Sequence, residues 1–255
     1  MRILTVGDVV GEPGRNAVQE VLPGIINECH ADLVVANGEN IAHGLGITLN
    51  TAYDLFNSGV DVITSGNHIW AKREIIPHLD GQIPIIRPLN FPPGAPGRGY
   101  WITKNVLVVN LIGRVFVGDY DCPFRAMDNL LSTLTDLPKV IIVDFHAEAT
   151  SEKIALGRYL DGRVSAVVGT HTHVGTVDAM VFPNGTAYVS DIGMVGPEES
   201  VIGDDAGSVI HSFLTKMPHR ISVGKGKSVF MAMLIEVDPC TGKASSIKRI
   251  QREHI

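Results

Sequence analysis

Several residue types are scarce in this 255-residue chain, and each shortage excludes a class of protein. The three cysteines, Cys29, Cys122 and Cys240, are odd in number, far apart and in no CxxC pair, which argues against a disulfide framework and a thiolate metal site. No apolar run approaches the about 20 residues that span a bilayer, and the first residues lead directly into an apolar strand without a signal-peptide pattern. We therefore expect a cytoplasmic protein with no membrane partner.

Basic residues are also outnumbered by acidic ones. The chain has 21 Lys and Arg against 27 Asp and Glu, and its formal net charge is −6. Such a chain lacks the cationic surface that holds a nucleic-acid backbone, so we expect no stable nucleic-acid complex, although metal ions can hold a nucleotide-sized substrate. With 45% hydrophobic residues and no internal repeat, residues 1–255 are expected to form one domain. The sequence leaves open whether the chain forms a homo-oligomer.

Predicted helices alternate with apolar, strand-like segments in the first part of the chain. This order is typical of right-handed crossover units on a parallel sheet. Later segments with central turns, such as Pro183-Asn184-Gly185, predict antiparallel hairpins instead. We therefore expect an α/β fold of two stacked sheets with helices outside. Helices are predicted at residues 13–29, 48–57, 72–78, 123–134 and around 151–160, and hairpins at residues 100–112, 177–190 and 228–251.

Five apolar, strand-like segments run directly into residue types that bind metals. In an open α/β sheet, ligands bind beyond the carboxyl ends of the strands, so side chains far apart in the sequence can meet there. One such histidine alone would more often be structural, and it is the repetition of the pattern that predicts a metal site. The segments are residues 3–7, 33–38, 62–66, 140–145 and 166–170, and the candidate metal ligands at their ends are Asp8, Glu39, Asn40, Asn67, His146, His171 and His173.

The seven candidates offer carboxylate and amide oxygen together with imidazole nitrogen, and no thiolate. This mixture suits iron, manganese or zinc better than a soft metal. Seven ligands exceed what one catalytic ion with an open position can use, but they suffice for two ions that share a bridging carboxylate. Two ions roughly 3.5 to 4 Å apart can hold a bridging hydroxide as nucleophile and clamp the phosphoryl oxygens of a substrate. The sequence therefore predicts phosphoester hydrolysis.

Four further residues are candidates for roles beside the ions. His68 directly follows Asn67, and adjacent residues that leave a strand usually point in different directions. We therefore expect His68 to protonate the leaving oxygen rather than to bind metal. His43 lies in a flexible, Gly-containing loop and can face the mouth of the site. Arg114 and Arg125 can pair with a phosphate oxygen, although a solvated surface position is the better expectation for each.

Three blocks carry most of the candidate ligands: Gly7-Asp8, Gly66-Asn67-His68 and Gly169-Thr170-His171-Thr172-His173. They resemble the GD, GNH and GHxH blocks of the calcineurin-like metallophosphoesterase superfamily, the last with one extra residue after Gly169. Val10 stands where the GDxH block of that superfamily has a ligand histidine, and Gly38-Glu39-Asn40 replaces its GDxxD block. These departures are similar to one branch, the bacterial YmdB-like phosphodiesterases. The strings shared with that branch extend over essentially the full length and include residues 7–11, 38–40, 46–48, 65–68 and 121–124.

The resemblance implies a four-layer α/β/β/α sandwich, a cytoplasmic location, iron or a similar ion, and hydrolysis of phosphodiesters, notably 2′,3′-cyclic nucleotides. It also implies a role for each candidate residue, with Glu39 bridging two ions and His68 as proton donor. In this assignment Asn40 compensates for the histidine that is absent at position 10. One ion is held by Asp8, Glu39, Asn40 and His173, and the other by Glu39, Asn67, His146 and His171.

Three other functions compete with a dinuclear phosphodiesterase. A phosphomonoesterase would use the same metals, and a regulatory metal-binding protein would use them with little turnover. A nucleotide binder with residues 7–14 as a phosphate loop is the weakest alternative. Asp8 and Glu12 put negative charge where phosphate would lie, and no Walker Lys-Ser/Thr pair follows.

Overall fold

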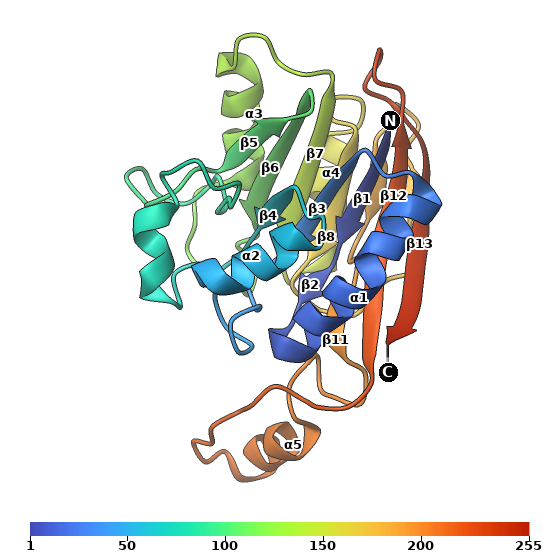
Figure 1. Ribbon diagram of the computed structural model, residues 1–255. Coiled ribbons are helices and arrows are strands. Elements are labelled where there is room, and N and C mark those ends of the chain that lie inside the picture. The colour runs from blue at the N-terminus through green and yellow to red at the C-terminus, as the bar shows by residue number, and fades with distance from the viewer. Residues whose placement is uncertain (255) are drawn as a thin grey trace.

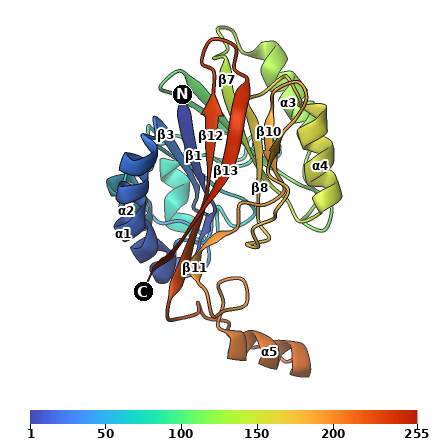
Figure 2. The same ribbon diagram turned by 90° about the vertical axis from the view of Figure 1, so that its right-hand side faces the viewer.

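Two β-sheets face each other in the protein, and helices cover the outer face of each sheet (Figures 1 and 2). This computed structural model describes residues 1–254. The first sheet has the strand order β2-β11-β12-β1-β3-β4, with β13 also paired to β12, and consists of β1 (Arg2–Val6), β2 (Asp8–Val9), β3 (Leu33–Asn37), β4 (Val62–Thr64), β11 (Met194–Pro197), β12 (Ser228–Val237) and β13 (Ala244–His254). The second has the order β5-β6-β7-β8-β10-β9 and consists of β5 (Tyr100–Thr103), β6 (Val106–Ile112), β7 (Val140–His146), β8 (Ala166–Thr170), β9 (Met180–Val181) and β10 (Ala187–Val189).

Both sheets combine parallel and antiparallel strands. Strands β1, β3 and β4 run parallel in the first sheet, and β6, β7, β8 and β10 run parallel in the second. The three predicted hairpins are confirmed as the antiparallel pairs β5–β6, β9–β10 and β12–β13. Parallel strands place their carboxyl ends at one edge of a sheet, which is the arrangement that the predicted site requires.

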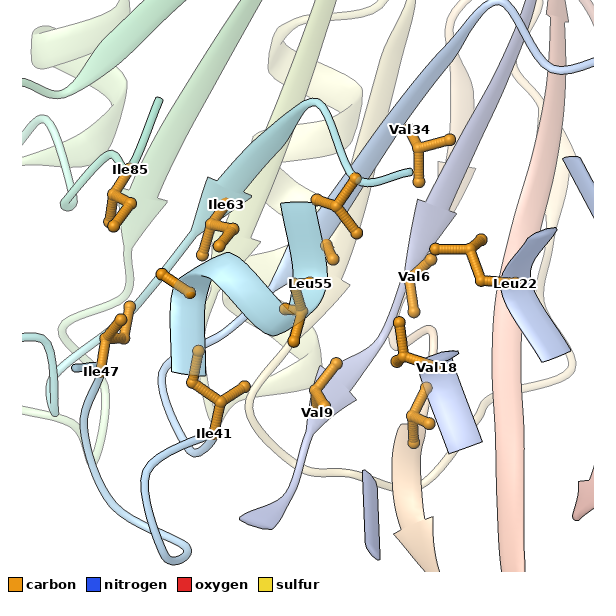
Figure 3. Packing of buried hydrophobic residues seen from close by; sticks show 14 of the residues in the cluster. Val6, Val9, Val18, Leu22, Val34, Ile41, Ile47, Leu55, Ile63 and Ile85 are labelled. Carbon is orange, nitrogen blue, oxygen red and sulfur yellow. The ribbon is translucent and has the colours of Figure 1, made fainter. Parts of the chain in front are cut away.

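Alternate residues of the inner strands enter different cores, as the two-residue period of a strand dictates. On β3, Val34 faces the core between the first sheet and its helices, which also contains Leu22, Leu55 and Ile63 (Figure 3). Its neighbour Val35 instead faces the core between the two sheets. A third core fills the space between the second sheet and its helices. These layers confirm the predicted α/β/β/α sandwich.

The first sheet is covered by α1 (Gly11–Cys29) and α2 (Leu49–Asn57), and the second by α3 (Pro123–Thr133) and α4 (Thr150–Tyr159) (Figure 2). Helix α2 begins after Thr48, whose side chain accepts from the Thr51 amide in a capping box. Pro23 lies inside α1 without ending it. The short helix predicted at residues 72–78 is confirmed as the 3-10 helix η1 (Arg73–His78), which has Pro77 inside it. No helix among residues 1–254 is long and apolar enough to cross a membrane.

One part of the fold has no counterpart in the sequence predictions. Helix α5 (Ala206–Thr215) stands off the body beyond the ends of β2 and β11 (Figures 1 and 2). Among its residues only Val209 is buried. Strands β2 and β11, which pair with each other at the edge of the first sheet, were also missed, because each is too short to give a periodic pattern.

Candidate metal centre

All seven predicted metal ligands lie at one edge of the sandwich, where the carboxyl ends of strands from both sheets converge. The first sheet supplies the oxygen ligands: Asp8 begins β2, Glu39 and Asn40 follow β3, and Asn67 follows β4. The second sheet supplies the histidines. His146 is the last residue of β7, and His171 and His173 follow β8.

The centre of this cluster is a contact between the two sheets. His146 Nε2 lies 3.1 Å from Glu39 Oε1 and 3.0 Å from His171 Nδ1. Ligand atoms of these three side chains all lie within 4.8 Å of one another, a spacing that one metal ion can occupy. Gly66 leaves room for them, because a Cβ at this position would be 2.2 Å from His146 Cδ2 and 2.4 Å from Glu39 Oε2.

Asp8 and His173 face each other beside this cluster. Asp8 Oδ2 accepts from the His171 amide at 3.2 Å, whereas Oδ1 lies 3.8 Å from His173 Nε2, too far for a hydrogen bond. His173 Nδ1 lies 2.6 Å from the Ile202 carbonyl oxygen and therefore donates to it, which leaves Nε2 free toward Asp8. His171 and His173 have positive φ angles of 98° and 64°. Such non-glycine conformations are costly and cluster at functional sites.

Three oxygen atoms of the predicted ligands are orphaned. Among residues 1–254, the buried side-chain oxygens without a hydrogen-bond partner are Asp8 Oδ1, Asn40 Oδ1 and Asn67 Oδ1. The nitrogen of each side-chain amide has a partner, and this contact fixes the orientation of the amide. Asn40 Nδ2 donates to the Gly44 carbonyl at 3.1 Å, and Asn67 Nδ2 lies 3.0 Å from His68 Nε2. An unsatisfied buried acceptor costs about 1–3 kcal/mol, and a cation would satisfy all three. The donor set therefore fits metal ions.

The charges of the cluster are strongly coupled. Burial disfavours the charged form of Glu39, but the charge and hydrogen bond of His146, with a smaller contribution from His68, outweigh it and lower the pKa of Glu39 to about 2. Burial likewise opposes protonation of His146, but Glu39 first and Asp8 next raise the pKa of His146 to about 9. Burial, then the charge of His146, lowers the pKa of His171 to about 4. Burial raises the pKa of Asp8 to about 7. Without metal, a proton on His146 thus takes the place of a cation.

A buried hydrogen-bond chain orients His146. Thr170 Oγ1 donates to Asp144 Oδ1 at 2.7 Å and lies 3.0 Å from His146 Nδ1. Because the hydroxyl proton is used by Asp144, its oxygen accepts from Nδ1–H, and Nε2 faces Glu39. Asn37 and Thr64 also donate to Asp144. The sequence analysis did not single out this carboxylate, which lies within the strand rather than at its end.

A second supporting carboxylate, Asp191, fixes the loop that carries His171 and His173. Its Oδ2 accepts from the amide and hydroxyl of Thr172 at 3.2 and 2.8 Å, and from Lys153 Nζ at 2.8 Å. The sequence contained a signal for Asp191, because it follows the apolar strand 187–189 in the same way as the predicted ligands follow theirs.

A cavity of about 190 Å³ opens onto the cluster and contains His68 in its wall. The His68 amide donates to Glu39 Oε2 at 3.2 Å, and His68 Nε2 lies 3.0 Å from Asn67 Nδ2. Asp204, which no sequence pattern indicated, also lines this cavity. The remaining lining residues are Val10, Glu39, Asn40, Gly44, Leu45, His171, His173 and Ile202.

The other candidates lie outside this cavity. His43 lines a neighbouring groove. Arg125 lines a larger cavity of about 660 Å³ between α3 and residues 87–93, which contains none of the predicted ligands. Arg114 lies on the loop after β6, where its amide donates to Glu152. The size of the larger cavity is no argument for function, because the unpartnered oxygens and coupled charges are at the smaller one.

The two stacked sheets with their outer helices have the fold of a calcineurin-like phosphoesterase. The solved calcineurin-like phosphoesterase YfkN from Bacillus subtilis has the same fold over 100% of this chain and 90% of its own, with a TM-score of 0.57 at 12% identity. The chain belongs to the YmdB-like protein family, whose family model matches residues 4–250.

Relatives resemble the chain over nearly its whole length. It is 46% identical over 254 residues to the 2′,3′-cyclic-nucleotide 2′-phosphodiesterase of Bacillus subtilis (strain 168), a match that covers 98% of this chain and 96% of the relative. The crystal structure of a novel phosphatase from Mycoplasma pneumoniae matches with a TM-score of 0.93 and 32% identity, over 100% of this chain and 94% of that one.

Proposed function

We propose that this chain, a phosphoric ester hydrolase, cleaves 2′,3′-cyclic nucleotides or similar small phosphodiesters with two bound transition-metal ions. The enzyme class follows from its relatives, a phosphodiesterase and a phosphatase. The observation that carries the proposal is the set of three buried, unpartnered oxygens on Asp8, Asn40 and Asn67. Asn40 lines the cavity together with Glu39, His171 and His173. The name of the Bacillus relative supports the cyclic nucleotide as substrate.

The proposed ligand sets are those that the family resemblance implies, and the approach of Asp8 to His173 and of His146 to Glu39 and His171 supports part of each set. Asp8, Asn40 and His173 would hold one ion, and Asn67, His146 and His171 the other, with Glu39 shared between them. Oxygen and nitrogen ligands without sulfur suit iron, manganese or zinc, and the family resemblance favours iron among them. When bound, such ions would supply Lewis acidity that activates water and neutralises charge on the phosphoryl oxygens.

His68 is the proposed general acid. It lines the cavity, and its backbone amide is tied to Glu39. If Asn67 binds metal through Oδ1, its Nδ2 donates to His68 Nε2 across the observed 3.0 Å. The neutral ring that accepts this bond is the form that His68 takes after it has acted, because the acid form is the imidazolium, which gives one proton to the leaving oxygen.

Metal analysis combined with a substrate screen tests the proposal. Protein purified without chelator should contain two ions per chain and hydrolyse 2′,3′-cyclic AMP and bis-p-nitrophenyl phosphate, with the chelator-treated protein as control. A single ion in a fully loaded preparation would contradict the dinuclear site. Metal without turnover of any diester would instead favour a regulatory protein.

A phosphomonoesterase is the second candidate, favoured by the phosphatase from Mycoplasma pneumoniae that shares the fold over the whole chain. It would hydrolyse p-nitrophenyl phosphate faster than bis-p-nitrophenyl phosphate, and the phosphodiesterase the reverse. The cytoplasmic location and the oligomeric state stay predictions.

A further inference from the structure

A second hollow adjoins the candidate metal centre. It is a groove of about 290 Å³ between the start of α1, His43, and the segment from Arg220 to Lys225. The loop at residues 39–46 forms the wall between groove and cavity, with Asn40 and Gly44 on the cavity side and His43 on the groove side. The two hollows therefore lie on opposite sides of one short loop.

Backbone contacts fix the groove segment relative to the cavity. Gly224 N donates to the Gly203 carbonyl at 2.8 Å, and Asp205 N donates to the Ser222 carbonyl at 2.8 Å. Asp204, which lines the cavity, forms a β-bridge with Val223. On the other side, a Cβ on Gly44 would be 2.8 Å from Val223 Cγ2, so the segment packs directly against the dividing loop.

The segment that includes one wall of the groove, residues 206–227, has a net charge opposite in sign to that of the whole chain. Residues 206–227 contain four Lys and Arg and no Asp or Glu, although the chain has a net charge of −6. Two of the four, Arg220 and Lys225, line the groove, both exposed, and none of the ion pairs described within residues 1–254 involves them. Glu12 also lines the groove, and Asp205 lies near Lys225. Two cations, one carboxylate and the imidazole of His43 give the groove a cationic balance.

We propose that this groove binds a second phosphate of the substrate, attached to its 5′ oxygen. The inference rests on the proposed function. A 2′,3′-cyclic phosphate occupies the 2′ and 3′ oxygens of the ribose, so a further phosphate on the sugar must be on the 5′ side. Arg220 and Lys225 supply charge-assisted donors for it, and Glu12 weakens its binding by repulsion. The substrate class is thus 5′-phosphorylated or short oligonucleotides that end in a 2′,3′-cyclic phosphate.

Three substrates with the same reacting group test this inference. They are adenosine 2′,3′-cyclic phosphate, its 5′-phosphorylated form, and the dinucleotide ApA with a terminal 2′,3′-cyclic phosphate. The metal-loaded wild type should have a kcat/KM about tenfold higher for at least one of the last two, which corresponds to about 1.4 kcal/mol from one added charge-assisted hydrogen bond. A gain with the 5′-phosphate alone identifies a terminal phosphate as the occupant, and a gain only with the dinucleotide identifies an internucleotide one. Equal kcat/KM for all three would overturn the inference.

Variants locate the effect in the groove. R220A/K225A should lose the preference and keep the wild-type kcat/KM for adenosine 2′,3′-cyclic phosphate, whereas E12Q should increase the preference. The double variant K216A/K248A is the matched control, because it removes the same charge outside the groove. Preference that persists in R220A/K225A, or that disappears equally in the control, would overturn the inference.

Failure of the proposed function would be seen separately. In that case the wild type hydrolyses none of the three substrates. The groove is then judged by equilibrium binding to the metal-loaded protein, with 3′-AMP and adenosine 3′,5′-bisphosphate as probes. Tighter binding of the bisphosphate in the wild type, but not in R220A/K225A, supports the groove, and equal binding of both probes overturns it.

Discussion

The first sheet carries every predicted oxygen ligand of the site, whereas the second sheet carries every predicted imidazole ligand. The two sides differ in state as well as in chemistry. On the oxygen side, Asp8, Asn40 and Asn67 each keep an unpartnered oxygen, and on the imidazole side Glu39 lies 3.1 Å from His146 Nε2 and raises the pKa of His146 to about 9. The site therefore exists only where the sheets pack together, and its metal would join two layers that the apolar core between them already holds.

Glu39 is the point where the two sides meet, and replacing it should have the largest effect. The Glu39→Gln variant keeps the size of the side chain but removes the negative charge that faces His146 and the proposed ions. Because metal ions supply several kcal/mol of charge stabilisation, we expect kcat/KM to fall on the order of 10⁴-fold, with loss of metal. Metal analysis and diester hydrolysis measure both. Near wild-type turnover would show that Glu39 does not bridge the ions.

His68 comes from the oxygen side but is not a predicted ligand, so its loss should separate catalysis from metal binding. General acid catalysis contributes about a hundredfold to ten-thousandfold, and His68→Ala should lose kcat on that scale while it retains both ions. A nitrophenolate leaving group departs without a proton, so bis-p-nitrophenyl phosphate should be affected much less than 2′,3′-cyclic AMP. Equal losses on the two substrates would exclude the acid role, and loss of metal would make His68 a ligand.

The strand ends could be predicted from the sequence because each is an apolar segment that is followed directly by a polar residue. That pattern placed Asp8, Glu39 and His146 at the same edge, and it would have found Asp191 had the strand at 187–189 been considered alone. The apolar runs and hairpin turns likewise predicted most strands and helices. Contacts across the two sheets could not be predicted in this way, because nothing local in the sequence sets the distance between Glu39 and His146.

Other parts of the site gave no local signal. Asp144 lies inside a buried strand and not at its end. It accepts hydrogen bonds from Thr170 and other side chains that only the folded structure brings near it. Asp204 and the groove segment lie in irregular parts of the chain. Two backbone hydrogen bonds hold these parts together, from Gly224 N to the Gly203 carbonyl and from Asp205 N to the Ser222 carbonyl. Helix α5 was missed because it buries little of its surface, and periodicity in sequence reports burial.

Thr170 orients the imidazole side, and its hydroxyl should matter less than either ligand or acid. Thr170→Val breaks the bond to His146 Nδ1 and leaves Asp144 with one donor fewer. Changes that remove such an outer hydrogen bond typically cost about 10- to 100-fold in metal affinity or activity. Thr186→Val is a matched control, because Thr186 is also buried, directly before β10 of the second sheet, and donates to the Val164 carbonyl, away from the site. Equal losses in both variants would show a general packing effect.

Metal binding should depend on pH because protons occupy both sides of the metal-free site. The pKa of His146 is raised to about 9, so this imidazole is charged at pH 7 and must lose its proton to bind metal. The pKa of Asp8 is raised to about 7, so part of the protein must lose a second proton. Calorimetry in buffers of different ionisation enthalpy should detect release of more than one proton per chain at pH 7. Release of none would contradict the coupled charges.

The same shift predicts how the metal-free protein responds to alkali. A raised pKa means that the folded state binds the His146 proton more tightly than the unfolded state does. The stability contributed by the His146–Glu39 pair is therefore fully present below the ordinary histidine pKa of about 6.5 and is lost as pH rises through about 9. Chemical denaturation of chelator-treated protein between pH 6 and 10 should show this loss. Metal-loaded protein should not, because the ion replaces the proton.

The smallest effect on activity is expected from replacing Arg114 or Arg125, which both lie beside the second sheet. Neither Arg114 nor Arg125 lines the cavity at the metal centre: the amide of Arg114 is bonded to Glu152, and Arg125 faces a separate cavity beside α3. Because the positive charge near the substrate would come from the ions, Arg114→Ala and Arg125→Ala should leave KM for 2′,3′-cyclic AMP unchanged. Steady-state kinetics measure this, with the thermal stability of each variant as the folding control. A charge-assisted bond to phosphate contributes roughly 1.5–3 kcal/mol, so a rise in KM of about tenfold or more in either variant would show that the arginine reaches the substrate. The second sheet would then supply fixed positive charge as well as imidazoles.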